Sequence, residues 1–362
     1  MGTRFIEGVV LVVLSALTSL GCDETKKESP KGQVSAATVV TSATAKAAEP
    51  ATESAPEGCK AKGDKPFQVG TVVGDAFGFA GDATHLYCAT WQVYGGRGDI
   101  SKIRKDGQGS QPLAGLKLEP RGLALDNDTL YFTSGIRLNS VPKSGGAATT
   151  LDEQFSSQSI TVDDKAVYGV PGNYGPYDRL ARIGKKGGAS TELASAKRPK
   201  LSTGPNGYNG MALDESGVYV ADSGNGRILK FPLAVGKPQP LATGLKRPFD
   251  LAIDGSNVYF SLAGGDLMMV PKAGGKTSKL ATGLVESARI AAGSAAVYTT
   301  QSSKDEGANV IKISPADGRT KTVAAVPASH LVSVITLDKD CVYWVERFDA
   351  TKSVVFAMPV GN

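Results

Sequence analysis

The sequence predicts an all-β fold built as a ring of seven four-stranded sheets. Three observations indicate it. A Tyr-centred strand motif recurs about every 40 residues, short apolar runs alternate with Gly, Asp, Asn and Ser turn clusters, and the 362 residues include 44 Gly and 19 Pro. Beyond the first twenty or so residues, no segment keeps the apolar period of a helix. Repeats of this length with four strands each are typical of a β-propeller.

The clearest copy of the repeat spans residues 209–245. Its four apolar runs are Met211–Leu213, Val218–Ala221, Ile228–Phe231 and Gln239–Ala242, and the turn-forming residues between them fit an antiparallel meander. A Tyr in the second strand marks each copy along the chain. The anchor tyrosines are Tyr87, Tyr131, Tyr168, Tyr219, Tyr259, Tyr298 and Tyr343.

The two ends of the repeat region predict how the ring closes. The seventh copy has only three strands, and an unpaired strand, Phe67–Val73, precedes the first copy. If Phe67–Val73 pairs with Val354–Met358, the two ends of residues 66–362 complete the seventh blade together. Closure removes the exposed sheet edges that favour aggregation. Six or eight blades remain the alternatives if a weak copy is misread.

The N-terminal segment, residues 1–21, is typical of a bacterial export signal. Arg4 precedes an apolar run from Val9 to Leu20, which at about 12 residues is shorter than the ~20 that span a bilayer. Residues 22–65 are rich in Ala, Thr, Ser, Lys, Glu and Pro, so we expect a disordered linker.

The stretch Ser19-Leu20-Gly21-Cys22 resembles the lipobox of bacterial lipoproteins. The resemblance implies that Cys22 is lipidated and becomes the new N-terminus. It places the protein in the bacterial cell envelope, anchored to the outer membrane or to the periplasmic side of the inner membrane. Plain secretion and an uncleaved anchor are the alternatives.

Two stretches resemble known propeller repeats. Tyr219–Phe231 resembles the NHL repeat, and Val342–Trp344 resembles the YWTD type. Families with such repeats include sugar-lactone hydrolases, peptide-amidating lyases, receptor modules and binding scaffolds. The resemblance therefore implies a fold without implying one activity.

Three cysteines remain when Cys22 is set aside as the lipid site. Cys341 opens the Tyr strand of the seventh copy and Cys59 lies just before the closing strand, so a Cys59–Cys341 disulfide would fasten the ring. On the chain-entropy model this bond is worth about 4 kcal/mol. A disulfide from Cys88 to either partner, or three buried thiols, are the alternatives. The sequence has no CxxC, which disfavours a redox or metal role.

Charge and motifs exclude several classes of function. The net charge of +5 is spread over 40 basic and 35 acidic residues, unlike the dense basic stripe of a nucleic-acid-binding protein. The fold places His85 and His330 on opposite faces, so they share no metal, and we expect no metal site formed by histidines. Phosphate-binding and G-x-S-x-G motifs are absent from the sequence.

The face that carries the loops before the inner strands is the predicted binding face. Aromatic and basic groups on such loops are typical of contact surfaces, although ordinary solvated loops are the alternative. The aromatic candidates are Trp91, Tyr94, Tyr174, Tyr177 and Tyr208.

Four cations precede inner strands at nearly equivalent repeat positions: Arg121, Arg247, Arg289 and His330. Ring closure would aim several of them at the channel mouth, where they would suit an anionic ligand. Structural salt bridges to nearby Glu119, Asp250 and Glu286 are the alternative.

Acids end most inner strands: Asp126, Asp163, Asp214, Asp254 and Asp338. Because they recur regularly, we interpret them as caps of backbone N–H groups in the hairpin turns. Calcium binding by a subset is the alternative.

Together these features predict an envelope-anchored lipoprotein whose propeller is a binding or assembly platform for a protein or an anionic or glycan ligand. We expect no cofactor. The alternative is a calcium-dependent enzyme resembling the lactonase and lyase propellers, in which Asn209 and Asp250 would supply part of the calcium site.

Overall fold

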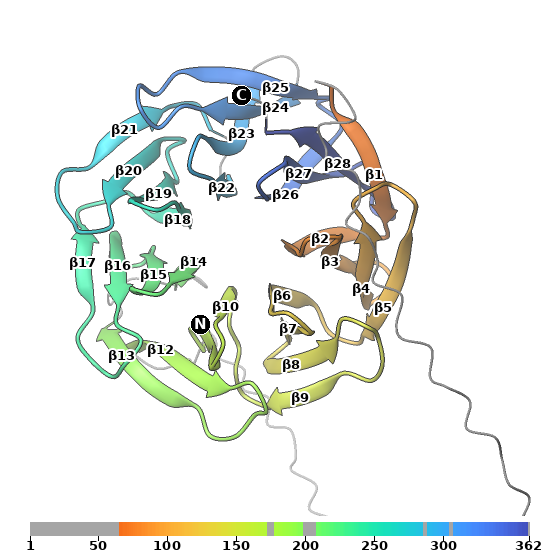
Figure 1. Ribbon diagram of the computed structural model, residues 1–362, viewed down its shortest axis with the longest axis horizontal. Coiled ribbons are helices and arrows are strands. Elements are labelled where there is room, and N and C mark those ends of the chain that lie inside the picture. Colours follow the sequence, from red (N-terminus) through yellow and green to blue (C-terminus); the bar gives the residue numbers. More distant parts are fainter. Residues whose placement is uncertain (1–64, 172–176, 198–207, 285–287, 304–306, 361–362) are drawn as a thin grey trace, which may run out of the picture. The chain divides into compact units, whose positions relative to one another are not determined.

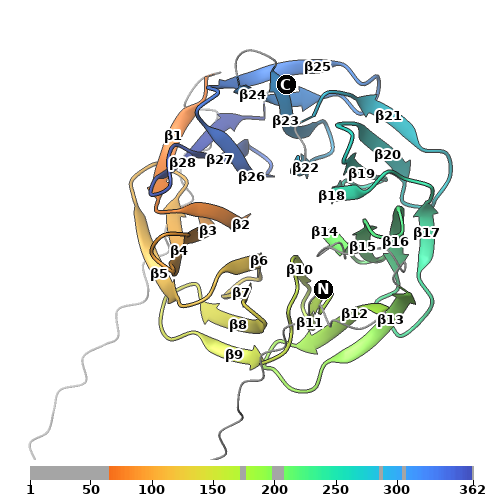
Figure 2. The ribbon, with the colours of Figure 1, turned by 180° about the vertical axis from the view of Figure 1, so that it is seen from behind.

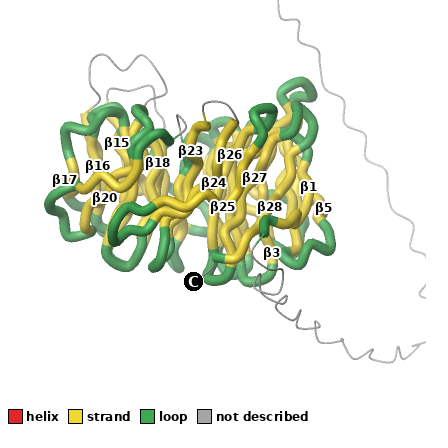
Figure 3. Tube along the Cα trace, turned by 90° about the horizontal axis from the view of Figure 1, so that it is seen from above, coloured by secondary structure: helices red, strands yellow, loops and turns green. Residues whose placement is uncertain are grey.

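The computed structural model describes residues 65–171, 177–197, 208–284, 288–303 and 307–360, and these form 28 β-strands. The strands make seven four-stranded antiparallel sheets arranged as blades around a central axis (Figures 1 and 2). Figure 3 shows the ring from its edge, with turns and loops gathered on two faces. In the described part of the chain, no helix is long and apolar enough to cross a membrane.

Blades 1 to 4 follow one another along the chain, and each runs from its inner to its outer strand. Blade 1 contains β2 (Asp75–Gly81), β3 (His85–Gln92), β4 (Arg97–Arg104) and β5 (Ser110–Leu116). Blade 2 contains β6 (Pro120–Leu125), β7 (Thr129–Ser134), β8 (Arg137–Pro142) and β9 (Thr149–Asp152). Blade 3 contains β10 (Ile160–Val162), β11 (Ala166–Gly169), β12 (Tyr177–Gly184) and β13 (Thr191–Lys197). Blade 4 contains β14 (Tyr208–Asp214), β15 (Gly217–Asp222), β16 (Arg227–Phe231) and β17 (Gln239–Ala242).

Blades 5 to 7 complete the ring. Blade 5 contains β18 (Pro248–Ile253), β19 (Asn257–Leu262), β20 (Leu267–Pro271) and β21 (Ser278–Ala281). Blade 6 contains β22 (Ile290–Ala292), β23 (Val297–Ser303), β24 (Gly307–Ile313) and β25 (Thr320–Val326). Blade 7 contains β26 (Leu331–Leu337), β27 (Cys341–Arg347), β28 (Ser353–Pro359) and, as its outer strand, β1 (Phe67–Val72).

The second strand of a blade is buried on both faces because it packs between two neighbouring blades. Every residue of β15 is buried, which explains why its sequence, GVYVAD, is largely apolar rather than alternating. The core consists of clusters that bridge blades. The cluster between blades 4 and 5 includes Tyr219, Ala221 and Ile228 on one side and Leu251, Val258 and Phe260 on the other.

Strand β1 closes the ring, as the sequence predicts. It pairs antiparallel with β28, with Phe67 opposite Ala357 and Val72 opposite Ser353, and the register shifts between Gln68 and Gly70. The seven-bladed prediction is therefore confirmed. The expected export signal, Cys22 and nearly all of the expected linker lie outside the described residues.

The cysteines divide into bonded and free. Cys341 is disulfide-bonded, whereas Cys88 is a free, fully buried thiol whose pKa is raised to about 12 by burial. Cys88 is therefore not the partner of Cys341, and three buried thiols are ruled out. Cys59, like Cys22, lies outside the described residues, so the Cys59–Cys341 pairing stays a prediction.

The first prediction concerns the packing of the closing strand. A Cβ on Gly70 would lie 2.7 Å from Cγ2 of Ile103, a fully buried side chain of blade 1, whereas at Gly115 the nearest atom is 3.9 Å away. We expect Gly70→Val to lower the free energy of unfolding by about 1–3 kcal/mol through overpacking. The control Gly115→Val, on an outer strand, should change it by less than about 0.5 kcal/mol. Urea unfolding measures both, and equal effects would contradict the packing argument.

The second prediction concerns the disulfide. We expect peptide mapping of the non-reduced protein to recover one cross-linked pair, Cys59–Cys341, and alkylation to label Cys88 only after unfolding. Cys59→Ser should lower the free energy of unfolding by about 4 kcal/mol, because the bond restricts the unfolded chain. Cys88→Ala leaves the bond intact and serves as the control for the peptide map, since a Ser at this buried position would place a polar hydroxyl in an apolar cluster. Recovery of any other cross-linked pair would refute the assignment.

Candidate functional site

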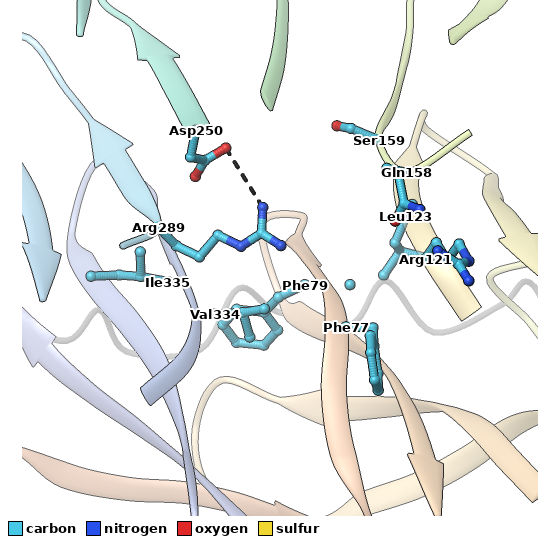
Figure 4. A pocket seen from close by; sticks show the side chains of 12 residues that line it. Phe77, Phe79, Arg121, Leu123, Gln158, Ser159, Asp250, Arg289, Val334 and Ile335 are labelled. Atoms are coloured by element: carbon cyan, nitrogen blue, oxygen red, sulfur yellow. Dashed lines mark ion pairs between the residues drawn. The ribbon is translucent and has the colours of Figure 1, made fainter. Parts of the chain in front are cut away.

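The inner strands surround a pocket of about 130 Å³ in the central channel (Figure 4). Its lining comes from six of the seven blades, which only ring closure brings together. Ten of its side chains are Phe77, Phe79, Arg121, Leu123, Gln158, Ser159, Asp250, Arg289, Val334 and Ile335. The lining thus combines an apolar floor with two arginines, one carboxylate and two neutral polar groups.

Arg289 is the cation best placed to meet a ligand in this pocket. Its Nη1 lies 3.8 Å from Oδ1 of Asp250, too far for a hydrogen bond, and its guanidinium stacks 5.0 Å from the ring centre of Phe249. The Arg289 side chain is 39% exposed, against 14% for Asp250. The aromatic ring and the loose ion pair therefore orient the guanidinium and leave part of it open.

Asp250 lies beside Arg289 and forms hydrogen bonds within and between blades. Its Oδ2 accepts a hydrogen bond from the backbone N–H of Ile290 at 3.0 Å, and its own N–H donates to Ser261 Oγ at 3.2 Å. Burial raises the pKa of this carboxyl and outweighs the lowering effect of Arg289. Asp250 thus connects β18 of blade 5 to β22 of blade 6.

The four predicted cations do not form one rim. Arg121 lines the same pocket as Arg289, but Figure 4 shows its guanidinium on the far side, directed away from Arg289. Arg247 is exposed in the turn before β18, with a left-handed φ of 48°, and is not part of the lining. Of the four cations, only Arg121 and Arg289 line this pocket, and they lie on opposite sides of it.

His330 is held beside blade 7 by its own partners. Its Nδ1 lies 3.4 Å from Oε2 of Glu346, and its ring packs 3.8 Å, centroid to centroid, from Phe348. The four cations lie at different distances along the chain from the acid of the inner turn, so the fold places them differently. Arg121 precedes Asp126 by five residues, whereas His330 precedes Asp338 by eight.

The aromatic candidates fall into two groups. Trp91 is half-buried at the end of β3, and Tyr94, 92% exposed, stands in the turn that follows, on the face where the inner strands begin. Tyr177 opens β12 and Tyr208 opens β14, but their side chains lie outside the described residues, as does Tyr174 entirely. Within the described part, Tyr94 is the prominent exposed aromatic of this face.

The acids of the inner turns are structural caps, as the sequence predicts. Oδ1 of Asp126 accepts the backbone N–H groups of Asp128 and Thr129, and Oδ2 accepts the hydroxyl of Tyr131 at 3.0 Å. The pKa of Tyr131 rises to about 12 through burial and this carboxylate. The same bonds recur at Asp82, Asp163, Asp254 and Asp338. The described residues contain no group of three or more His, Cys, Asp or Glu arranged to hold a metal.

A lysine from the next blade completes four of these acid–tyrosine pairs, an arrangement that we call the lysine clasp. Each clasp lysine lies three residues after the residue that pairs with the anchor Tyr of its own blade. In blade 2, Tyr131 pairs with Ser140, so the clasp residue is Lys143, which binds Asp82 of blade 1. The four Nζ–Oδ2 distances are 2.8 Å for Lys143–Asp82, 2.7 Å for Lys185–Asp126, 2.6 Å for Lys272–Asp214 and 2.6 Å for Lys105–Asp338. No motif within one repeat predicts these lysines, although Lys143 and Lys272 directly follow the recurrent Val-Pro.

The third prediction tests a clasp. Burial works to raise the pKa of Asp214, but hydrogen bonds from Lys272 and Ser216 lower it on balance. We expect Lys272→Met to reduce the free energy of unfolding at pH 7 by about 1–3 kcal/mol, since both partners are largely buried. The ordinary pKa of Asp is about 4, and that of Asp214 in the folded protein is lower. The loss should therefore shrink as the pH falls from about 4 through the lowered pKa of Asp214, because the protonated acid no longer attracts the lysine.

The matched control for that prediction is Lys279→Met, which removes the more exposed pair with Asp266. It should change the free energy of unfolding by less than about 1 kcal/mol. Urea unfolding at pH 7 and pH 3 measures both variants. A Lys272→Met effect independent of pH would show that the clasp is not electrostatic.

The chain matches no protein-family model and no curated protein. Among solved structures it is similar to BamB from Moraxella catarrhalis, with a TM-score of 0.57 and 13% identity over 80% of this chain and 99% of that one. YCF48 from Cyanidioschyzon merolae gives a TM-score of 0.60 with 11% identity over 82% and 98%, respectively. The WD40 β-propeller domain of Doa1 gives 0.59 with 12% identity over 80% and 96%. At these identities the likeness shows fold alone, and this chain has the fold of a seven-bladed β-propeller.

Proposed function

We propose that this protein is a lipid-anchored binding platform of the bacterial cell envelope, and that its channel mouth receives a carboxylate-bearing segment of a protein or glycan partner. A β-propeller suits binding or assembly because it presents loops from many blades around one axis. The anchoring at Cys22 rests on the lipobox resemblance. The linker expected at 22–65 would hold the propeller away from the membrane surface.

The open guanidinium of Arg289 is the observation that carries the binding role. A planar guanidinium can donate two parallel hydrogen bonds to a carboxylate, which fixes both position and orientation. Phe249 and Asp250 hold the group in place, and the 3.8 Å contact leaves its donors available to an incoming anion. Arg121 adds positive charge on the other side of the same pocket.

The pocket favours a small acidic group at the end of a longer partner. Its volume of about 130 Å³ admits a carboxylate but not a whole sugar or peptide. The rest of the partner would therefore lie across the loops of this face, where Tyr94 and its exposed neighbour Val93 offer apolar contact. Aromatic residues beside basic ones are enriched in protein interfaces.

The calcium-dependent enzyme has no comparable support among the described residues. Asp250 already interacts with Arg289 and the N–H of Ile290, and no cluster of metal-ligating acids accompanies it in the described part of the chain. A platform keeps its ligand affinity in EDTA, whereas a calcium site loses it. Each binding measurement is therefore made with and without EDTA.

The fourth prediction concerns the separate effects of Arg289 and Asp250 on ligand affinity. With an oligoglutamate peptide and an oligogalacturonate as probes, Arg289→Ala should weaken binding by about tenfold, since a hydrogen bond to a charged group is worth about 1.5–3 kcal/mol. Asp250→Asn should strengthen binding, because the amide oxygen still accepts from Ile290 while the competing negative charge is gone. Calorimetry at pH 7 and low salt measures both.

Two controls make the outcome specific. Arg247→Ala removes an exposed cation outside the lining and should leave affinity unchanged. An oligoglutamine peptide should not bind measurably to the wild-type protein. If Arg247→Ala weakens binding as much as Arg289→Ala does, the attraction is a general effect of net charge and the proposed site is wrong.

A further inference from the structure

Lysine clasps join most, but not all, of the neighbouring blades in the described part of the chain. On the face opposite the channel mouth, six of the seven blades place a turn acid next to the clasp position of the following blade. Within the described residues, four of the seven blade junctions have a lysine there. The other three clasp positions hold Leu233, Pro315 and Val360.

Two of the exceptions are compensated from within the ring. At the junction of blades 6 and 7, Gly293 replaces the acid, and Tyr298 Oη and Lys312 Nζ both donate to the carbonyl of Val360, at 2.8 and 3.0 Å. At the junction of blades 3 and 4, Arg182 donates to the carbonyl of Leu233 at 3.3 Å. This Arg pairs directly with Tyr168, the tyrosine bonded to Asp163, so a cation still serves that junction.

Among the described residues, the junction of blades 5 and 6 keeps its acid without a cation at either of the two positions that hold one elsewhere. Asp254 binds its turn and accepts the hydroxyl of Tyr259 at 2.6 Å, as in the complete clasps. The residue opposite Tyr259 is Met269 and the clasp position is Pro315, so neither of the two cation positions is filled. Among the described residues Asp254 has no ion-pair partner.

An open pocket lies at this junction. Its volume is about 480 Å³, and its lining includes Asp254, Met269, Ser294, Ala295, Ser314 and Pro315. The lining therefore comes from both blades, and Met269 and Pro315, the two positions that hold cations elsewhere, form part of its wall. The structure thus contains an acceptor for an ammonium group, with space beside it.

We propose that this pocket binds a primary alkylammonium group supplied from outside the propeller, as a fifth clasp formed in trans. Asp254 Oδ2 would accept the ammonium as Asp214 accepts Lys272, at a distance near 2.6 Å. The ring of Tyr259 would contact the cation as Tyr219 and Tyr343 contact Lys272 and Lys105, at 5.6 and 5.1 Å from the ring centres.

The alkyl part of the ligand has a place in the same pocket. Met269, Ala295 and Pro315 offer apolar surface to a chain of a few methylene groups, while the ammonium is hydrogen-bonded. A calcium ion fits less well, because it needs six to eight oxygens and Asp254 already accepts three hydrogen bonds. A lysine side chain of another polypeptide and a free diamine share the required chemistry.

The fifth prediction is the test of this site. Calorimetry at pH 7 uses n-butylamine, cadaverine and Nα-acetyl-lysine methylamide as probes with the folded wild-type protein, which we expect to bind them. Asp254→Asn should weaken binding by about tenfold, the range of a lost charge-assisted hydrogen bond. Asp163→Asn is the matched control: it alters an equivalent turn acid at the junction where Arg182 lies opposite the anchor tyrosine, and should leave amine affinity unchanged.

Two further variants fill the pocket from within. Pro315→Lys restores the clasp residue and Met269→Arg reproduces the arrangement of Arg182; each should abolish amine binding and raise the melting temperature. The two routes are independent, so failure of one variant to fold leaves the other informative. Tighter binding of the lysine derivative than of n-butylamine identifies a polypeptide source, and the reverse order identifies a small amine. Absence of amine binding to the wild-type protein, or equal binding by Asp254→Asn, overturns the proposal.

Discussion

The pairing of β1 with β28 is the constraint on which the rest of the molecule depends. Seven sheets fit around one axis only if the last joins the first, and this junction is made by backbone hydrogen bonds between strands almost 290 residues apart, from Phe67 to Ala357. Closure brings six blades to the same channel pocket. It also gives every turn acid a neighbouring blade, so both candidate sites exist because the circle is complete.

The acid, the tyrosine and the lysine of each clasp connect neighbouring blades. The acid binds its own turn through one oxygen and presents the other to the tyrosine and to the lysine of the next blade. A buried charge left without a partner costs several kcal/mol. At the junction of blades 6 and 7 both charges are absent together, because Gly293 replaces the acid and Val360 replaces the lysine. Asp163 and Asp254 both keep the acid without a clasp lysine; Arg182 lies opposite the anchor tyrosine beside Asp163, whereas Met269 holds that position beside Asp254.

Much of the fold could be predicted from local sequence. The tyrosines of the second strands, the turn residues after them and the spare strand before the first copy are all short-range signals, and each leads to the observed blade or junction. The acids of the inner turns could also be interpreted correctly, because an Asp followed within three residues by a strand is a local cap.

The candidate site could be predicted less well. A cation a few residues before the inner turn can lie in the channel or in a surface turn, and its offset decides between them. Arg289 lies four residues before Gly293 and lines the channel pocket, whereas Arg247 lies seven residues before Asp254 and is in a surface turn. The lysine clasps join residues such as Asp82 and Lys143 across a blade boundary. No periodicity within one repeat reveals such a contact; it emerges when strand register is known.

The closing junction also has a consequence for how the protein is made. Among the described strands, β1 is the first along the chain and its partner β28 the last, so β1 has no strand to pair with until β28 has been synthesised. A nascent chain that stalls before residue 353 lacks the means to complete its circle. A protease therefore encounters either a closed ring or an open ring in which the edge of β28 is unpaired, and the unpaired edge is the more accessible substrate.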